Sequence, residues 1–243
     1  MNTKKILLFI SLAVISLMNT SCLLVNLNSV TGSGSIESKN INLSSFNSVQ
    51  IQSSADVYIN RGEDLNVTLS DYGNLLSYWN LEVEGNNLLI KTDQLASLIN
   101  SRAKVIITLP TDLYNIKING SGNVYLNSSF STLDKVSIEG SGKVFSSQSA
   151  NYNNLSIYIG GSGDVNLSGS AQQYIAKIEG SGSVKSAHLR AKNADCRISG
   201  SGSIYVNAQE TLKARIYGSG DIIYTGRPIV DFQHSGSGNL IHE

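Results

Sequence analysis

Few residues of this 243-residue sequence could do acid–base chemistry. Glu139 and Glu179 occupy equivalent positions of a repeat, two units apart, and stacked strands would place them roughly 10 Å from each other. This spacing lies near the upper limit for the two carboxylates of an inverting glycosidase. No cluster of Asp with Lys or Arg beside it can be assembled around them. We therefore interpret both as solvated strand carboxylates and expect no catalytic residue.

Thiol and metal chemistry is equally sparse. Cys196 holds a position that Ile or Ala fills in other repeats, which predicts a buried, inert thiol. His188, His234 and His242 lack the spacing of metal ligands. The segment 160–165, Gly-Gly-Ser-Gly-Asp-Val, resembles a calcium-binding nonapeptide, but that motif needs a period of nine residues rather than about 20. We expect neither a metal nor a cofactor.

Cys22 is the residue with the clearest covalent role. An apolar run, 6–18, follows Lys4-Lys5 and is too short to span about 30 Å of hydrocarbon, so it fits the core of an export signal. The next residues, 19–22, read Asn-Thr-Ser-Cys and resemble a lipobox, in which the cysteine thiol takes a diacylglycerol before cleavage. Asn19 departs from the usual Leu, and an ordinary secretory signal is the alternative. We expect a signal peptide over 1–21 and a lipid-anchored linker over 22–35.

A repeat of about 20 residues dominates the C-terminal half. Gly-Ser-Gly occurs seven times at steps of 18 to 21 residues, with apolar residues spaced by two on either side. This spacing is the strand period, so each unit should run strand, corner, strand and polar return, as at 127–134 or 207–211. We expect the glycines to supply positive φ at the corners. They are Gly120, Gly122, Gly140, Gly142, Gly161, Gly163, Gly180, Gly182, Gly200, Gly202, Gly218, Gly220, Gly236 and Gly238.

Stacking explains why the same residue types recur. One unit cannot bury its own apolar residues, whereas strands stacked about 4.8 Å apart bury them all and pair every backbone group. The sequence therefore predicts an all-β parallel β-helix over 111–243, and an antiparallel meander is the alternative. Residues 36–110 should cap this stack and supply its first coils within the same domain, because 51–59 aligns with 118–126, with both glycines replaced.

Residues 36–110 show other local signals. The triplet Gly85-Asn86-Asn87 reads as a hairpin turn. Short helical turns are expected at 75–79 and 94–101. The strand candidates are 65–69, 81–83, 88–90 and 105–109.

Two outward columns of the stack could bind a ligand. Lys117, Lys177, Arg197 and Arg215 lie three residues before the first Gly of their units, the last three in successive coils. Like charges stacked near 5 Å repel, so Glu179 or an anionic ligand such as a glycan should offset them. Five residues after the first Gly lie aromatic side chains that would stack on sugars or be covered by return loops or a partner chain. They are Tyr125, Phe145 and Tyr205, in a column that also holds Ile223.

The repeated Ile-x-Gly-Ser-Gly-x-Val pattern, preceded by 46–51, 57–62 and 105–110, resembles the putative auto-transporter adhesin, head GIN domain family. The resemblance covers roughly 40–240. It implies a single-stranded, right-handed parallel β-helix, similar in shape to pectin lyases, on an exported protein of a Gram-negative bacterium. The activity of that family is not established, adhesion is proposed from its shape, and no catalytic residue carries over.

These observations favour a non-enzymatic, lipid-anchored binding or adhesion module of the cell envelope. A carbohydrate-active enzyme on the same scaffold and a purely structural envelope protein are the alternatives. We expect an outer-membrane lipoprotein on the periplasmic or surface side, with a glycan or cell-surface ligand and a second copy of the chain as candidate partners. The net charge of zero argues against binding to nucleic acid.

Overall fold

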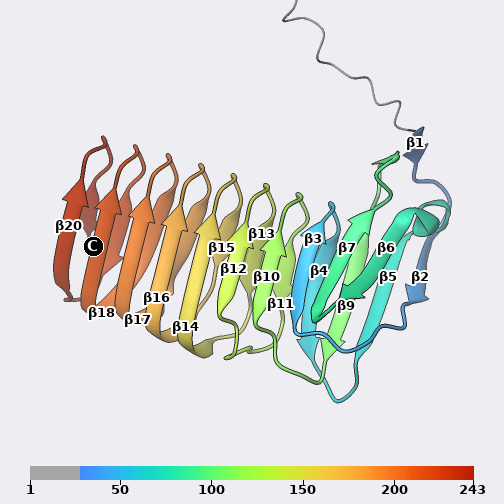
Figure 1. Cartoon of the computed structure of the whole chain (residues 1–243), viewed down its shortest axis with the longest axis horizontal. Coiled ribbons are helices and arrows are strands. Elements are labelled where there is room, and N and C mark those ends of the chain that lie inside the picture. Colours follow the sequence, from blue (N-terminus) through green and yellow to red (C-terminus); the bar gives the residue numbers. More distant parts are fainter. Residues whose placement is uncertain (1–27) are drawn as a thin grey trace, which may run out of the picture.

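The computed structural model describes residues 28–243. The signal peptide expected at 1–21, Cys22 and the first part of the expected linker, 22–27, lie outside this part of the chain. Within it, no helix has the length and apolar character needed to cross a membrane. The described residues form an elongated stack of strands with a short 3-10 helix near its N-terminal end (Figure 1).

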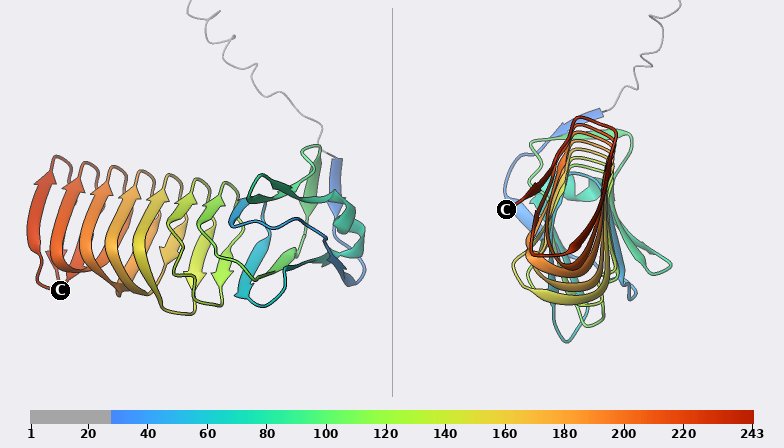
Figure 2. Two further views of the ribbon diagram at one scale, coloured as in Figure 1. Left: turned by 60° about the horizontal axis from the view of Figure 1, so that its bottom comes forward. Right: turned by 90° about the vertical axis from the view of Figure 1, so that its left-hand side faces the viewer.

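Each coil of the stack has two long sides joined by a tight corner, and seen end-on the coils superpose as narrow loops (Figure 2). We call the strands before the corner the front side and those after it the back side. The front side holds β3 (Ser48–Gln52), β10 (Asn115–Ile118), β12 (Lys135–Ile138), β14 (Ala150–Ile159), β16 (Gly169–Ile178), β20 (Ile229–His234) and the C-terminal parts of β17 (Ser183–Ile198) and β18 (Ser203–Ile216). The back side holds β4 (Asp56–Arg61), β11 (Val124–Leu126), β13 (Lys143–Ser146), β15 (Asp164–Asn166), β19 (Ile222–Thr225), β21 (Leu240–His242) and the N-terminal parts of β17 and β18.

The coils pair in parallel and in the predicted register. Ile138 lies between Ile118 and Ile159 in the ladder, and Ile178 follows Ile159. All four are fully buried. Every strand pairing between residues 111 and 242 is parallel, so the β-helix prediction is confirmed and the meander is excluded.

The corner glycines are required for a different reason from the one expected. Among the described glycines, positive φ occurs at Gly34, Gly85, Gly169 and Gly226, and at none of the seven repeated Gly-Ser-Gly corners. Instead, successive corners stack backbone on backbone: a Cβ on Gly200 would lie 2.0 Å from the carbonyl oxygen of the glycine one coil below. The expectation of positive φ at these corners is therefore wrong, and close approach of two backbones takes its place.

The first coil shows when a corner can do without glycine. Ile51 pairs with Ile118 and Val57 with Val124, as the alignment of 51–59 with 118–126 predicts. Ser53 occupies a corner position there. The layer below consists of β7 (Asn87–Thr92) and β9 (Lys104–Leu109), which are joined by a long segment that contains β8 (Ala96–Ile99). No tight corner therefore lies beneath the first coil, and a Cβ is tolerated.

The N-terminal end is closed by antiparallel strands. β5 (Asn66–Tyr72) pairs with β9 and with β2 (Ile36–Asn40), and β6 (Trp79–Glu84) forms the predicted hairpin with β7. A 3-10 helix, η1 (Gly73–Tyr78), matches the helical turn expected at 75–79. The turn expected at 94–101 is wrong, because β8 there pairs in parallel with β1 (Asn28–Thr31).

The returns between coils differ along the stack. The return at 127–134 is an irregular loop anchored by buried Phe130 and Leu133. The return expected at 207–211 is instead extended backbone within β18, which continues the ladder with β17 across register shifts. In the coils of β17 and β18, one continuous strand therefore replaces the loop that returns from the back side to the front side.

The C-terminal end has no such cover. Every residue of β20 is exposed, although Phe232 and His234 hold positions that face the core in earlier coils. Their rings stack on each other with centroids 5.1 Å apart. The open end thus presents the side chains of an unfinished core layer. The homo-oligomer expected from the sequence stays a prediction.

One pair of polar groups crosses the core. The Tyr174 hydroxyl lies 2.7 Å from Ser186 Oγ, and both side chains are buried. Tyr174→Phe would leave the serine without this partner, so we expect a loss of about 1–3 kcal/mol in the free energy of unfolding. The double variant with Ser186→Ala should recover part of that loss. Urea unfolding of Tyr174→Phe, Ser186→Ala and the double variant checks the pair, and equal losses in Tyr174→Phe and the double variant would contradict it.

Candidate binding face

The outer face of the front side carries the basic row predicted from the sequence. Strand register places Lys177, Arg197 and Arg215 next to one another in successive coils. Lys117 lies farther along the same row, separated from them by Ser137 and Tyr158. We call this surface, formed by the outward side chains of β3, β10, β12, β14, β16, β17, β18 and β20, the front face.

Neighbouring groups offset the repulsion within the row. Lys177 Nζ lies 2.6 Å from a carboxylate oxygen of Glu179, as the sequence suggested. The Arg215 guanidinium lies 2.6 Å from the Asp231 carboxylate. Arg197 is held differently, since its guanidinium carbon lies 4.9 Å from the centroid of the Tyr217 ring. The row is therefore stable without a ligand, while its charges remain at the surface.

Each of the two acidic candidates has its own local partners. A carboxylate oxygen of Glu139 lies 3.2 Å from Lys117 Nζ. The other carboxylate oxygen accepts a hydrogen bond from Asn119 Nδ2, in the same coil as Lys117. The Lys177 ammonium and the Tyr158 hydroxyl hold the pKa of the Glu179 carboxyl below its ordinary value. A catalytic general acid needs the opposite shift, so this carboxylate is poorly suited to protonating a leaving group.

The aromatic column on the back side stacks on itself. Tyr58 and Tyr125 have centroids 4.6 Å apart, and Tyr125 and Phe145 5.7 Å apart, with rings within 17° of parallel. Lys104 Nζ covers the far end of this stack, 4.4 Å from the Tyr58 centroid. The ring faces are thus occupied by other side chains of the protein.

Tyr205 does not join this stack. In the next coil, the residue that pairs with Phe145 is Asn166, which is not aromatic. Tyr205 lies farther along the stack, between Lys185 and Ile223 of the adjacent coils. The structure therefore brings Tyr125 and Phe145 together and leaves Tyr205 apart from them. A continuous aromatic platform for sugars is not formed.

The candidate thiol and the calcium-like segment are also buried or paired within the protein. Cys196 is fully buried, and burial raises the pKa of its thiol, as its core position predicts. Asp164 of the calcium-like segment is 2.7 Å from Lys143 Nζ and accepts a hydrogen bond from the Ser183 N–H. Within residues 28–243, no group of three His, Cys, Asp or Glu side chains is placed to hold a metal ion.

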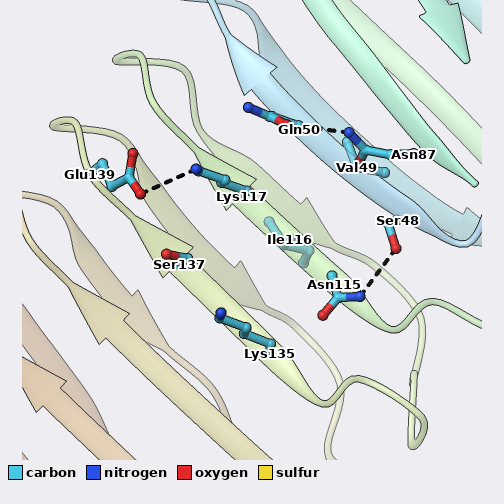
Figure 3. Close-up of a pocket in the computed structure, with 10 residues that line it drawn as sticks. All are labelled: Ser48, Val49, Gln50, Asn87, Asn115, Ile116, Lys117, Lys135, Ser137 and Glu139. Atoms are coloured by element: carbon cyan, nitrogen blue, oxygen red, sulfur yellow. Dashed lines mark hydrogen bonds and ion pairs between the residues drawn. The ribbon is translucent and has the colours of Figure 1, made fainter. Parts of the chain in front are cut away.

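A recess that the sequence did not predict lies on the front face near its N-terminal end (Figure 3). It has a volume of about 370 Å³ and is formed where β3, β7, β10 and β12 lie side by side. Amide, hydroxyl and ammonium groups dominate its lining. The lining residues are Ser48, Val49, Gln50, Asn87, Asn115, Ile116, Lys117, Lys135, Ser137 and Glu139.

Together, the parallel coils, the closed N-terminal end and the exposed front face define a β-solenoid of the kind found in bacterial adhesin-like proteins. The chain belongs to the family described as "Putative auto-transporter adhesin, head GIN domain", whose model matches residues 45–228. Membership implies an exported or cell-surface protein. No curated protein sequence matches the chain.

Several solved structures of bacterial proteins share the fold. A putative adhesin from Bacteroides fragilis is 25% identical, with a TM-score of 0.80 over 88% of this chain and 100% of the other. A putative lipid binding protein from Parabacteroides distasonis is 24% identical, with a TM-score of 0.72 over 89% of this chain and 100% of that one. A putative adhesin from Parabacteroides merdae is 21% identical, with a TM-score of 0.71 over 89% and 99% of the two chains.

Proposed function

We propose that this protein is a non-enzymatic binding module of the cell envelope whose front face binds an extended anionic glycan. The observation that carries the proposal is the uneven charge of the two long sides. In the coils of 111–242, the outward positions of the front face hold six basic residues (Lys117, Lys135, Lys177, Arg197, Lys213 and Arg215) and four acidic ones (Glu139, Glu179, Asp195 and Asp231). Those of the back side hold two of each (Lys143, Lys185, Asp164 and Asp221).

The repeat supports binding to a polymer in particular. Successive coils lie about 4.8 Å apart, so the charges of the row recur at short, regular intervals along a rigid surface. A polymer with regularly spaced anions can contact several coils at once, and the summed weak contacts give avidity that no single lysine provides. Exposed ion pairs such as Lys177 with Glu179 contribute little to folding, which leaves these cations available to a ligand.

Charge removal on the two sides tests the proposal. With residues 28–243 as a soluble protein and polygalacturonate as the anionic polymer, the Lys177→Gln, Arg197→Gln double variant should bind about tenfold more weakly than the unchanged protein. Lys143→Gln with Lys185→Gln removes the same charge from the back side and should bind normally. Binding should also weaken as salt is raised. Equal loss in both double variants would contradict the front-face assignment.

The enzyme alternative is tested with the same polymer. Prolonged incubation of polygalacturonate with the protein should release no new chain ends, and Glu139→Ala with Glu179→Ala should leave binding in place. Cleavage that disappears in this double variant would replace the binding module with a carbohydrate-active enzyme. Absence of binding to any charged or neutral glycan would favour the purely structural envelope protein.

We also propose that Cys22 anchors the protein to the outer membrane through a lipid. The support is the apolar run 6–18 followed by Asn-Thr-Ser-Cys, together with a family of exported proteins. In the full-length protein produced in its native host, Cys22→Ala should abolish lipid labelling and move the protein from the detergent phase to the aqueous phase. A variant that still partitions into detergent would contradict the anchor. Cys196→Ala is the matched control, because that thiol is buried in the core.

A further inference from the structure

The recess at the N-terminal end of the front face is one of two hollows on that face. The other, of about 420 Å³, lies farther along the stack and is lined by Asn193, Asp195 and Lys213 among others. The N-terminal recess is open because the shorter side chains of Asn115 and Ser137 lie beside the longer Lys135 and Lys117, respectively (Figure 3). Its volume of about 370 Å³ lies at the lower end of the range for small-molecule sites, about 300–1,000 Å³. The recess is therefore large enough for one small polar unit of a longer ligand.

The amide groups of the recess are held in place by one another. Asn87 Nδ2 donates to Gln50 Oε1 at 3.3 Å, and Gln50 Nε2 donates to Asn119 Oδ1 at 2.9 Å. Asn119 in turn donates to Glu139, which is also paired with Lys117. This chain of contacts joins four layers of the stack, so the orientation of each amide is fixed before a ligand arrives.

Three groups in the recess keep unused hydrogen-bonding capacity. Ser137 is 7% exposed, and its hydroxyl, which solvent in the recess still reaches, makes no hydrogen bond to residues 28–243. The Lys135 ammonium has no ion-pair partner in the same part of the chain, and Asn115 donates to Ser48 Oγ at 3.2 Å while its carbonyl oxygen stays free. One cation, one hydroxyl and one acceptor thus converge on the same space.

We infer that the recess binds one carboxylate-bearing sugar unit, a uronate, at the end of the front face. The inference rests on the proposed glycan binding and specifies the kind of unit. The Lys135 ammonium pairs with the carboxylate, and Ser137 with the fixed amides of Asn87 and Asn115 binds the ring hydroxyls. The ammonium groups of Lys117 and Lys135 and the carboxylate of Glu139 leave the recess with one net positive charge, which suits one carboxylate rather than a sulfate cluster.

A short oligomer separates this site from the general attraction of the face. Trigalacturonate and its methyl ester have the same hydroxyls, but the ester has lost its charges. The unchanged protein, residues 28–243, should bind the acid at least about tenfold more tightly than the ester. Lys135→Gln should remove that preference. Lys213→Gln is the matched control, since Lys213 lies in the same row of the front face but outside the recess.

Ser137→Ala provides a second, independent readout. Loss of its hydroxyl should weaken binding of the acid and of the ester by a similar factor of about five to ten. Equal effects of Lys135→Gln and Lys213→Gln, or no measurable binding of trigalacturonate, would overturn the recess as a site. If the protein still binds polygalacturonate through Lys177 and Arg197, only the recess inference fails. If neither the trimer nor the polymer binds, the proposed function fails with it.

Discussion

Gly200→Ala should destabilise the solenoid by more than about 3 kcal/mol, although it adds a single methyl group to a surface corner. The added Cβ would lie 2.0 Å from the Gly180 carbonyl oxygen and 2.5 Å from that of Glu179. Both contacts are with backbone atoms of the coil below, which no rotamer change can relieve. The two coils would have to separate locally, with loss of ladder hydrogen bonds and core contacts on both sides of the corner.

Two control substitutions separate this cause from others. Ser201→Ala alters the exposed middle residue of the same corner and should change the free energy of unfolding by less than about 0.5 kcal/mol. Gly34 has a φ of +87° and open space where a methyl group would be added, so Gly34→Ala should cost only the backbone strain of about 1–2 kcal/mol. Urea denaturation followed by circular dichroism gives the three midpoints. A Gly200→Ala variant as stable as Gly34→Ala would show that the corners do not stack as described.

Asp71→Ala should be comparably damaging at the other end of the molecule. The Asp71 carboxylate is fully buried and accepts hydrogen bonds from Trp79 Nε1 at 3.0 Å and Ser101 Oγ at 2.6 Å. It also accepts from the backbone N–H groups of Tyr72 and Arg102, both at 2.8 Å. Its removal leaves four donors without their acceptor in a buried site. We expect a loss of about 3–5 kcal/mol in the free energy of unfolding.

Trp79 makes the local effect of this substitution visible. It is the only tryptophan of the chain and is 8% exposed, so its fluorescence reports on the N-terminal closure alone. In Asp71→Ala the emission should shift to longer wavelength at lower urea than the loss of the circular dichroism signal. Asp71→Asn keeps the shape of the side chain but replaces one acceptor by a donor. Its stability should lie between that of the unchanged protein and that of Asp71→Ala. Unchanged emission and stability in both variants would contradict this role for Asp71.

The coils could be predicted because their determinants are local and repeated. The apolar residues spaced two apart before each Gly-Ser-Gly place Ile118, Ile138 and Ile178 in one buried column, and the strand pairing confirms this. The N-terminal closure could not be predicted in the same way. The order of its strands in space differs from their order in the sequence, because β7 and β9 lie beneath β3 and β4, which precede them in the chain. Asp71 carries no pattern that links it to Trp79 and Ser101, which are 8 and 30 residues away.

The candidate site likewise has one part that the repeat predicts and another part that it does not. The row of Lys177, Arg197 and Arg215 follows from the period alone. Asp231 and Tyr217, which offset two of its charges, have no such periodic signal. The recess lies over β3, β10 and β12, whose register follows from the repeat, and over β7. The position of β7 depends on how the N-terminal end is closed, which the repeat does not predict. One signal was available: aligning Ile51 with Ile118 already places Gln50 beside Lys117 in the outward row.

Lysine footprinting with bound polygalacturonate tests the front face most directly. Reductive methylation of residues 28–243, with and without the polymer, measures the accessibility of each ammonium group separately. We predict protection of Lys117, Lys135, Lys177 and Lys213 on the front face, with Lys143 and Lys185 on the back side labelled as in the free protein. Protection of the back-side lysines alone, or of both sides equally, would contradict the account.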